Sequence, residues 1–409
     1  MNPTEARPIA PPRPGEAAGA PHAATAEPRT GESGPARPLA RTPRLDSLDA
    51  FRGATIAAML LVNNPGSWSH IYAPLRHAEW HGWTPTDLIF PFFLFIVGVS
   101  MVFSLGGQLA RGASRAALFR KAGRRALILF GLGLVLHGFP KYDLATIRIP
   151  GVLQRIAWAY LPAAAILLTL GVRGQALIAG ALLLTYWALL TLVPVPGIGA
   201  GVLEPGQDLG AFIDRLIFTT DHLWAYSRTW DPEGLLSTLP AIATVLFGAL
   251  AGHWLRSERS GPEKAAGLFA AGTVALALGA AWGAVFPINK NLWTSSYAVF
   301  TTGMALHALG ICYWLIDVHG RKRWAKPFII FGTNAITAFF LSSLTARILG
   351  LVRWQTDTGT TTLKAAIHDT LFVPWLRPVD ASLAFAIGYV LFWLAFMAVL
   401  YRRKIFIKV

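Results

Sequence analysis

The sequence predicts an all-α polytopic membrane protein, and three observations support this fold class. Of its 409 residues, 54% are hydrophobic and only 14% are charged, whereas soluble proteins carry about a quarter charged residues. Runs of roughly 18 to 22 mostly apolar residues recur, and each can cross a hydrocarbon core of about 30 Å as a helix. Basic residues are concentrated in short connections between these runs. Together these features predict about ten transmembrane helices with both termini in the cytoplasm.

The expected spans follow the apolar runs and alternate between the two sides of the membrane. They cover residues 51–68, 84–106, 125–139, 152–170, 174–194, 236–255, 265–286, 295–317, 327–349 and 380–401. With this alternation, the basic segments 111–125, 256–259, 321–326 and 402–404 all fall on one side. Because positive charge is retained in the cytoplasm, the tryptophan-bearing polar connections are expected to face outward.

The first 44 residues differ in composition from the rest of the chain. They are rich in Pro, Ala, Gly and Arg and contain almost no large apolar side chains. Such a segment cannot offset its ordering entropy by burial, which predicts a disordered cytoplasmic tail at 1–44 before a transmembrane domain at 45–409.

The net charge of +15 does not indicate nucleic-acid binding, because the basic residues lie in the short connections between the spans. Cys312 is the only cysteine and indicates neither a disulfide nor a thiol metal site.

The connection between the first two spans is unusually polar and aromatic. With the adjoining span ends it contains Asn63, Asn64, His70, His77, Glu79, His81 and Asp87. Such groups are costly near a bilayer, which indicates a site lined by protein or water. The longest outward connection, at about 195–235, adds acidic and aromatic side chains that suit a sugar-binding mouth or an ordinary interfacial belt.

Several motifs occur in the order found in a known family. They are SLDAFRG, VNNPG, LRHAEWHGWTPTDLIFPFF, RIPGVLQR, DPEGLLSTLP, FPINKNLW and FGTNAITAF. From about residue 45 onward, the chain resembles the transmembrane heparan-alpha-glucosaminide N-acetyltransferase family. The resemblance implies a bacterial inner-membrane enzyme that moves an acetyl group from cytosolic acetyl-CoA to the amine of an amino sugar on the periplasmic side. It also implies a homodimer, and no metal is expected.

The resemblance assigns the catalytic residues by motif. The family's catalytic histidine matches His77, an asparagine at the end of its first core span matches Asn63, and the aspartate before its FP run matches Asp87. An imidazole titrates near pH 6.5, so it can act as a base or carry the acetyl group. We expect Asp87 to fix the imidazole tautomer and Asn63 to stabilise the thioester oxyanion. We expect His70 and His81 to be structural or interfacial.

Basic residues are candidates for holding coenzyme A. Four lie before or at the start of the third span, where guanidinium and ammonium groups suit phosphates: Arg120, Lys121, Arg124 and Arg125. The alternative is ordinary positive-inside topology. Arg155 lies a turn inside a span, where an unpaired charge is expensive. It is expected to meet the anionic cofactor or to form a structural ion pair, for example with Asp143.

Asparagines and a lysine near other spans complete the candidates. Asn289, Lys290 and Asn291 follow the seventh span and either line the acceptor pocket or cap helix ends. Asn334 lies within a span, where an amide is expected to join helices.

Two other functions fit the same spans. A secondary transporter of amino sugars would not bind acetyl-CoA, and a non-catalytic membrane component would tolerate replacement of His77 and Asn63.

Overall fold

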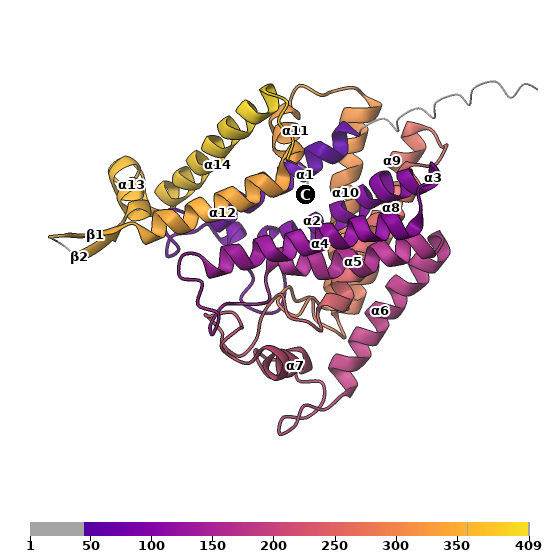
Figure 1. Cartoon of the computed structure of the whole chain (residues 1–409), viewed down its shortest axis with the longest axis horizontal. Coiled ribbons are helices and arrows are strands. Elements are labelled where there is room, and N and C mark those ends of the chain that lie inside the picture. The colour runs from indigo at the N-terminus through magenta and orange to yellow at the C-terminus, as the bar shows by residue number, and fades with distance from the viewer. Residues whose placement is uncertain (1–44, 358, 408–409) are drawn as a thin grey trace, which may run out of the picture. The chain divides into compact units, whose positions relative to one another are not determined.

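The computed structural model describes residues 45–357 and 359–407, and nearly all of its elements are helices (Figure 1). In chain order these are α1 (Asp46–Asn63), η1 (Ala73–Leu75), η2 (Pro85–Leu88), α2 (Ile89–Met101), η3 (Val102–Gly106), α3 (Gly107–Ala110), α4 (Arg115–Gly138), α5 (Val152–Thr169), α6 (Val172–Leu192), α7 (Leu209–Phe218), α8 (Thr238–Leu255), α9 (Gly261–Gly283), α10 (Ser295–Cys312), η4 (Tyr313–Val318), α11 (Lys326–Thr333), α12 (Ala335–Leu351), α13 (Leu363–Leu371) and α14 (Pro378–Arg402). The tail predicted at 1–44 lies outside the described residues.

The protein is a multi-pass membrane protein. Within the described part of the chain, seven helical stretches are long and apolar enough to cross a bilayer: Pro85–Ala110, Val152–Thr169, Val172–Leu192, Thr238–Leu255, Gly261–Gly283, Ser295–Val318 and Pro378–Arg402. Helices α11 and α12 make an eighth if the pair, bent by 82°, is one span. The ten-span count and the cytoplasmic placement of the termini therefore stay predictions.

Two of the ten predicted spans coincide with helices that are too charged to be counted. Helix α1 carries Asp46, Asp49 and Arg52, and the first half of α4 is basic. Helix α1 also ends at Asn63, earlier than the predicted boundary at 68, because Pro65 cannot continue a helix. The predicted span at 327–349 is not straight either, since it breaks at Asn334 between α11 and α12.

The segment between α12 and α14 contains structure that the sequence did not predict. Strands β1 (Arg353–Thr356) and β2 (Gly359–Thr362) form an antiparallel hairpin, with Arg353 opposite Thr362. Helix α13 follows the hairpin directly. Apart from this two-stranded hairpin, the all-α prediction is confirmed for the described residues.

Helix α2 begins two residues after Asp87 and packs closely against α8. Helix α9 likewise packs on α10, and α1 on α11. A Cβ atom added to Gly98 would lie 1.9 Å from the carbonyl oxygen of Val245, and one added to Gly248 would lie 2.0 Å from that of Phe95. Small residues let two backbones touch in this way. The α2–α8 pair therefore forms a rigid support for the residues at its end.

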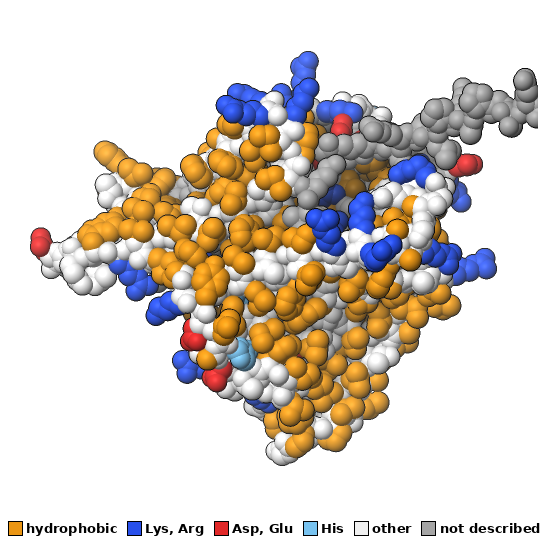
Figure 2. Space-filling model, in the orientation of Figure 1, with side chains coloured by type: hydrophobic (Ala, Val, Ile, Leu, Met, Phe, Trp, Pro, Cys, Tyr) orange, Lys and Arg blue, Asp and Glu red, His pale blue; other side chains and the backbone are white. Residues whose placement is uncertain are grey.

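The outer helices carry the apolar surface. Only 28%, 22% and 28% of the apolar windows of α6, α9 and α14 are buried, against 72% for α8. Figure 2 shows the resulting broad hydrophobic surface, with Lys and Arg side chains gathered along its top and right edges. A surface of this kind suits contact with hydrocarbon bounded by charged ends.

Candidate active site

His77 and Asp87 form a hydrogen-bonded pair where the polar connection enters η2. His77 Nδ1 lies 2.6 Å from Asp87 Oδ1. The other carboxylate oxygen, Oδ2, accepts hydrogen bonds from the backbone N–H groups of Ala78 and Thr84, both at 3.0 Å, and from the Thr84 hydroxyl at 3.1 Å. Thr84 and Asp87 are the two members of a capping box at η2. The turn that begins η2 therefore holds the carboxylate against the imidazole.

The two partners differ sharply in exposure. The Asp87 side chain is 1% exposed, whereas that of His77 is 46% exposed. The Tyr297 hydroxyl donates to the Asp87 backbone carbonyl at 2.5 Å, which fixes this residue from the α10 side as well. Because an ionised carboxylate only accepts hydrogen bonds, Nδ1 of a neutral His77 carries the proton and Nε2 keeps its lone pair. The sequence prediction that Asp87 meets His77 agrees with this geometry.

A second loop, 287–294, lies beside the His77 loop. The N–H group of Gly82 donates to the Ile288 carbonyl at 2.7 Å. Asn289 is fully buried: its Oδ1 accepts from the N–H group of Leu292 at 2.9 Å, and its Nδ2 lies 3.3 Å from His81 Nδ1. Asn289 and His81 thus hold the two loops together. This is the structural role that the sequence allowed for both.

Lys290 reaches the histidine from this second loop. Its Nζ atom lies 3.3 Å from His77 Nδ1, 3.5 Å from His77 Nε2 and 4.0 Å from Asp87 Oδ1. The Lys290 side chain is 18% exposed. Burial lowers the pKa of its ammonium group, while the carboxylates of Glu233 and Asp87 act in the opposite direction. An imidazole, a carboxylate and an ammonium group therefore meet at one place.

Two other predicted site residues are not joined to this group. The Asn63 side chain is exposed and hydrogen-bonds to no described residue, His77 and Asp87 included. Asn291 is half-buried and also has no side-chain hydrogen bond within the described part of the chain. Within residues 45–357 and 359–407, no three His, Cys, Asp or Glu side chains are placed to share a metal ion.

Arg155 is completely buried and is bound to a neighbouring segment of backbone. Its NH2 group donates to the carbonyl of Gly234 at 2.9 Å and to the hydroxyl of Ser237 at 2.6 Å, and NH1 donates to the Ser237 carbonyl at 3.2 Å. The guanidinium also lies over the Trp293 ring, 5.4 Å from its centroid. We call residues 231–237 the strap, because Arg155 ties them to α5.

An ion-paired arginine that the sequence did not single out holds the other end of the strap. Arg148 donates to Asp231 at 2.8 and 2.6 Å and to Glu233 at 2.5 Å. Arg148 lies in the RIPGVLQR motif, and Asp231 and Glu233 lie in the DPEG motif. The opposite charges of the two motifs were the feature of the sequence that could have predicted this ion pair. The suggested ion pair between Arg155 and Asp143 is wrong, since Asp143 instead accepts from the hydroxyl of Thr146 and the N–H group of Ala145.

The basic candidates on α4 lie elsewhere in the fold. Arg124 is exposed, and the Arg125 guanidinium lies 5.1 Å from the centroid of the Tyr160 ring. The Nε atom of Arg125 is buried and has no hydrogen-bond partner among the described residues. A buried N–H group without an acceptor is costly and suits an anionic ligand.

A row of aromatic rings starts on the His77 loop. Trp80 packs edge-on against Trp230, with ring centroids 5.0 Å apart. Trp224 lies 5.4 Å from Trp230 and 5.3 Å from Tyr226, which is 90% exposed. The Trp80 indole also donates to the Leu203 carbonyl at 2.7 Å. The long connection at 195–235 is therefore packed against the loop that carries His77.

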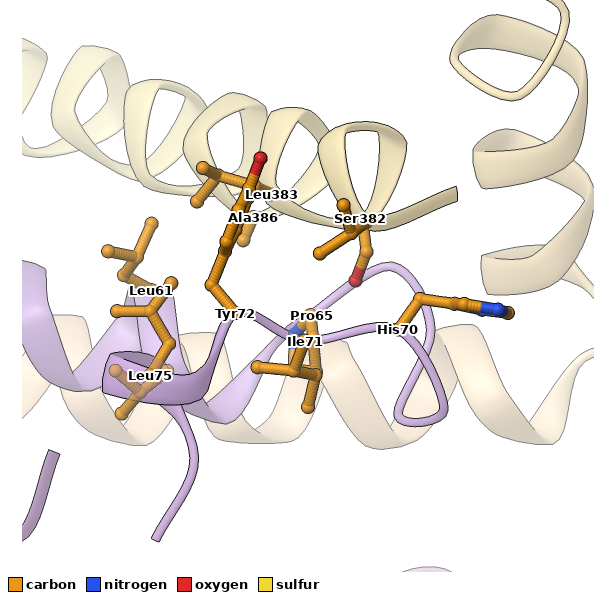
Figure 3. A pocket seen from close by; sticks show the side chains of 11 residues that line it. Leu61, Pro65, His70, Ile71, Tyr72, Leu75, Ser382, Leu383 and Ala386 are labelled. Atoms are coloured by element: carbon orange, nitrogen blue, oxygen red, sulfur yellow. The ribbon is translucent and has the colours of Figure 1, made fainter. Parts of the chain in front are cut away.

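A separate groove lies between the loop after α1 and the first turns of α14. It is shallow and is lined by Leu61, Val62, Pro65, His70, Ile71, Tyr72, Leu75, Val379, Ser382, Leu383 and Ala386. Figure 3 shows that the His70 ring points away from the other labelled side chains. The lining is mostly apolar and includes neither His77 nor Asp87, so the groove is distinct from the candidate active site.

Comparison with known proteins identifies the family. The model of the heparan-alpha-glucosaminide N-acetyltransferase catalytic family matches residues 44–279, more than half of the chain. The chain belongs to this family. The resemblance inferred from the motifs is confirmed, and the match contains His77, Asp87, Asn63, Arg124, Arg125 and Arg155, but ends before the loop of Lys290.

Two curated relatives carry the same name as the family. Heparan-alpha-glucosaminide N-acetyltransferase from Homo sapiens is 32% identical over 370 residues, which cover 76% of this chain and 55% of the human protein. The protein of that name from Mus musculus is 31% identical over 351 residues, covering 72% of this chain and 53% of the mouse protein. The chain thus spans about half the length of the curated relatives it matches.

Proposed function

We propose that the protein is a membrane N-acetyltransferase that moves the acetyl group of acetyl-CoA to the amine of an amino sugar. The observation that carries this proposal is the His77–Asp87 pair, which presents a half-exposed imidazole from a chain of the N-acetyltransferase family. Acetyl transfer requires a group that accepts a proton from the amine or carries the acetyl group. An imidazole can do either near neutral pH.

The geometry supports a defined part for each member of the pair. With Nδ1 donating to Asp87, the lone pair of His77 is on Nε2, the nitrogen that we assign to the substrate. In the direct route the amine nitrogen bonds to the acetyl carbon as the carbon–sulfur bond breaks. The ammonium loses two protons overall: His77 passes one to the departing sulfur, and the other goes to water. Asp87 stabilises the imidazolium that forms in between.

We place the phosphates of acetyl-CoA at Arg124 and Arg125. The unpartnered, buried Nε of Arg125 supports this assignment, because an arriving phosphate oxygen would satisfy it. Arg155 was the third candidate for this task. Its Nε is also buried without a partner among the described residues, but its NH1 and NH2 groups donate to the strap, so we assign it to positioning the strap instead.

The acceptor is assigned to the face that carries the aromatic row. Trp and Tyr rings present an apolar face beside a polar group, which suits the mixed surface of a sugar. Trp224, Trp230 and Tyr226 form the row that leads to Trp80, three positions from His77. We place this face on the periplasmic side of a bacterial inner membrane. Asn291 and Lys290 are the acceptor candidates left, since Asn289 is used within its own loop.

The test is transfer of labelled acetyl from acetyl-CoA to glucosamine by the purified protein in detergent. We expect product from the wild type and none above background from His77→Ala. His70→Ala is the matched control, because His70 is an exposed histidine of the same connection outside the pair, and it should keep wild-type activity. Normal turnover by His77→Ala would contradict the assignment. Uptake of unmodified amino sugar into proteoliposomes without acetyl-CoA binding would favour the transporter.

A further inference from the structure

Lys290 is the one charged side chain besides Asp87 that reaches His77 among the described residues. Its Nζ lies 3.3 and 3.5 Å from the two ring nitrogens. The lysine side chain is 18% exposed and the imidazole 46%. The ammonium therefore approaches from the protein side and leaves the other side of the ring open to substrate.

The backbone around Lys290 is held in place before any substrate arrives. Asn289 donates its N–H group to the Thr294 hydroxyl at 3.1 Å and accepts from Leu292 at 2.9 Å. Trp293 is buried at 1% exposure with a φ of +51°, a conformation that a bulky residue adopts only when its surroundings enforce it. A cation on such a loop is preorganised and needs little rearrangement during a reaction.

The hydrogen bonds of Asp87 leave the Lys290 ammonium with donors to spare. Oδ1 of Asp87 accepts from His77 at 2.6 Å, and Oδ2 accepts from Ala78 and Thr84. Lys290 is 4.0 Å from that carboxylate, too far for a hydrogen bond. It cannot donate to Nδ1 of His77, because this nitrogen carries the proton given to Asp87, and at most one of its N–H groups is directed to Nε2, 3.5 Å away. An ammonium group has three N–H donors, so at least one is available to a substrate atom.

We propose that Lys290 stabilises the negative charge on the acyl oxygen when the acyl carbon is attacked beside His77. The inference rests on the proposed acetyl transfer and gives that site its oxyanion-stabilising group. As the nitrogen–carbon bond forms, the carbonyl electron pair moves to oxygen, and the Lys290 ammonium donates a hydrogen bond to it. The carbonyl then re-forms as the carbon–sulfur pair leaves on sulfur, which takes a proton from His77. This is the role that the sequence gave to Asn63.

Position supports Lys290 over Asn63 for this role. A reacting acyl carbon about 3 Å from His77 Nε2 places its oxygen within reach of an ammonium that is 3.5 Å from the same nitrogen. The Asn63 amide has no hydrogen bond to the pair. Removing one oxyanion donor lowers turnover by roughly 10²–10³-fold in other acyl-transfer enzymes.

The experiment compares Lys290→Met and Lys290→Arg with the wild type, measuring kcat and KM for glucosamine. We expect Lys290→Met to lower kcat by roughly 10²-fold with little change in KM. Lys290→Arg, which keeps the charge, should recover part of kcat. Lys364→Met is the matched control, since this half-buried lysine of α13 lies over Trp68 and Phe385 and should leave kcat unchanged.

The outcomes separate this inference from the proposed function. An unchanged kcat with a raised KM for glucosamine would overturn the inference and return Lys290 to acceptor binding, while His77→Ala stays inactive. Loss of kcat in Lys290→Met with no recovery in Lys290→Arg would also overturn it. Wild-type turnover by His77→Ala would instead overturn the proposed function, and the inference with it. Thermal unfolding of each variant shows whether the protein is folded.

Discussion

The His77 site and the strap both contain charged groups that the sequence marked as functional, yet the structure builds them differently. His77 is 46% exposed and has one side of its ring free, with a single carboxylate fixed behind it. Arg155 is fully buried, and its NH1 and NH2 groups donate to the strap. A reactive group must be accessible, whereas a structural charge is enclosed by its partners; of the Arg155 guanidinium, only Nε has no partner among the described residues.

The family's motifs divide into those that place the reactive groups and those that hold the strap in position. HAEWHG and TPTD place the imidazole–carboxylate pair, while RIPGVLQR and DPEG supply Arg148 and Arg155 and the groups they bind. Variants of the first pair are expected to change turnover and leave stability nearly intact. Variants of the second set are expected to change stability first.

After loss of His77 itself, the largest effect is predicted for Asp87→Asn. An asparagine can donate its amide hydrogens to Nδ1, which favours the tautomer with the proton on Nε2 and blocks the free lone pair. We expect kcat to fall by roughly 10²–10⁴-fold, measured as acetyl transfer at saturating substrate. Asp380→Asn is a suitable control, because that acid pairs with Tyr72 and Arg377 away from the site. Full activity in Asp87→Asn would remove Asp87 from the mechanism.

A loss of stability is predicted for Arg155→Met. The change removes a donor from the Ser237 hydroxyl and from the carbonyls of Gly234 and Ser237. The Gly234 carbonyl keeps the hydroxyls of Ser237 and Thr238 as donors. Unsatisfied buried groups cost about 1–3 kcal/mol each, so the unfolding midpoint in detergent should fall by several degrees. Turnover per folded molecule should stay close to that of the wild type. A folded, normally stable variant that no longer binds acetyl-CoA would instead support the cofactor role.

The smallest effect is predicted for Asp214→Asn, beside the strap. Burial raises the pKa of Asp214 to about 7, and its Oδ1 accepts from the N–H group of Leu235 at 2.8 Å. A carboxyl with a raised folded pKa contributes stability at low pH that declines as pH rises from about 4 towards 7. The thermal unfolding midpoint of the wild type should therefore decrease as the pH is raised from 5 to 7.5. Asp214→Asn should reduce this decline by roughly 1 kcal/mol, and an unchanged slope would contradict the assignment.

Much of the fold followed from the sequence because long apolar runs have few structural options. Helices lie at all ten predicted positions in the described chain, but charge within α1 and α4 leaves seven or eight clear spans. The break at Asn334 was not predicted, because its cause is tertiary. The Asn334 amide binds the backbone of Ile405 and Ile407, far along the chain. The 353–362 hairpin was missed because four-residue strands carry little periodic signal.

The candidate site was predictable where its parts are close in sequence. His77 and Asp87 are ten positions apart, and one turn and its capping box bring them together. Lys290 lies 213 positions from His77, so only the pairing of two loops reveals its contact. The sequence predicted that Arg155 needs a partner, because an unpaired charge within a span is costly. It could not predict which partner, because backbone carbonyls are present in every residue and leave no pattern in side-chain identity.

The most direct test of the difference between the His77 site and the strap is turnover per folded molecule, measured side by side for His77→Gln and Arg155→Met in the same detergent. We expect His77→Gln to unfold at the wild-type temperature and to transfer no acetyl group. We expect Arg155→Met to unfold at a lower temperature, while its folded fraction turns over at nearly the wild-type rate. Wild-type turnover in His77→Gln, or a stable and inactive Arg155→Met, would contradict these expectations.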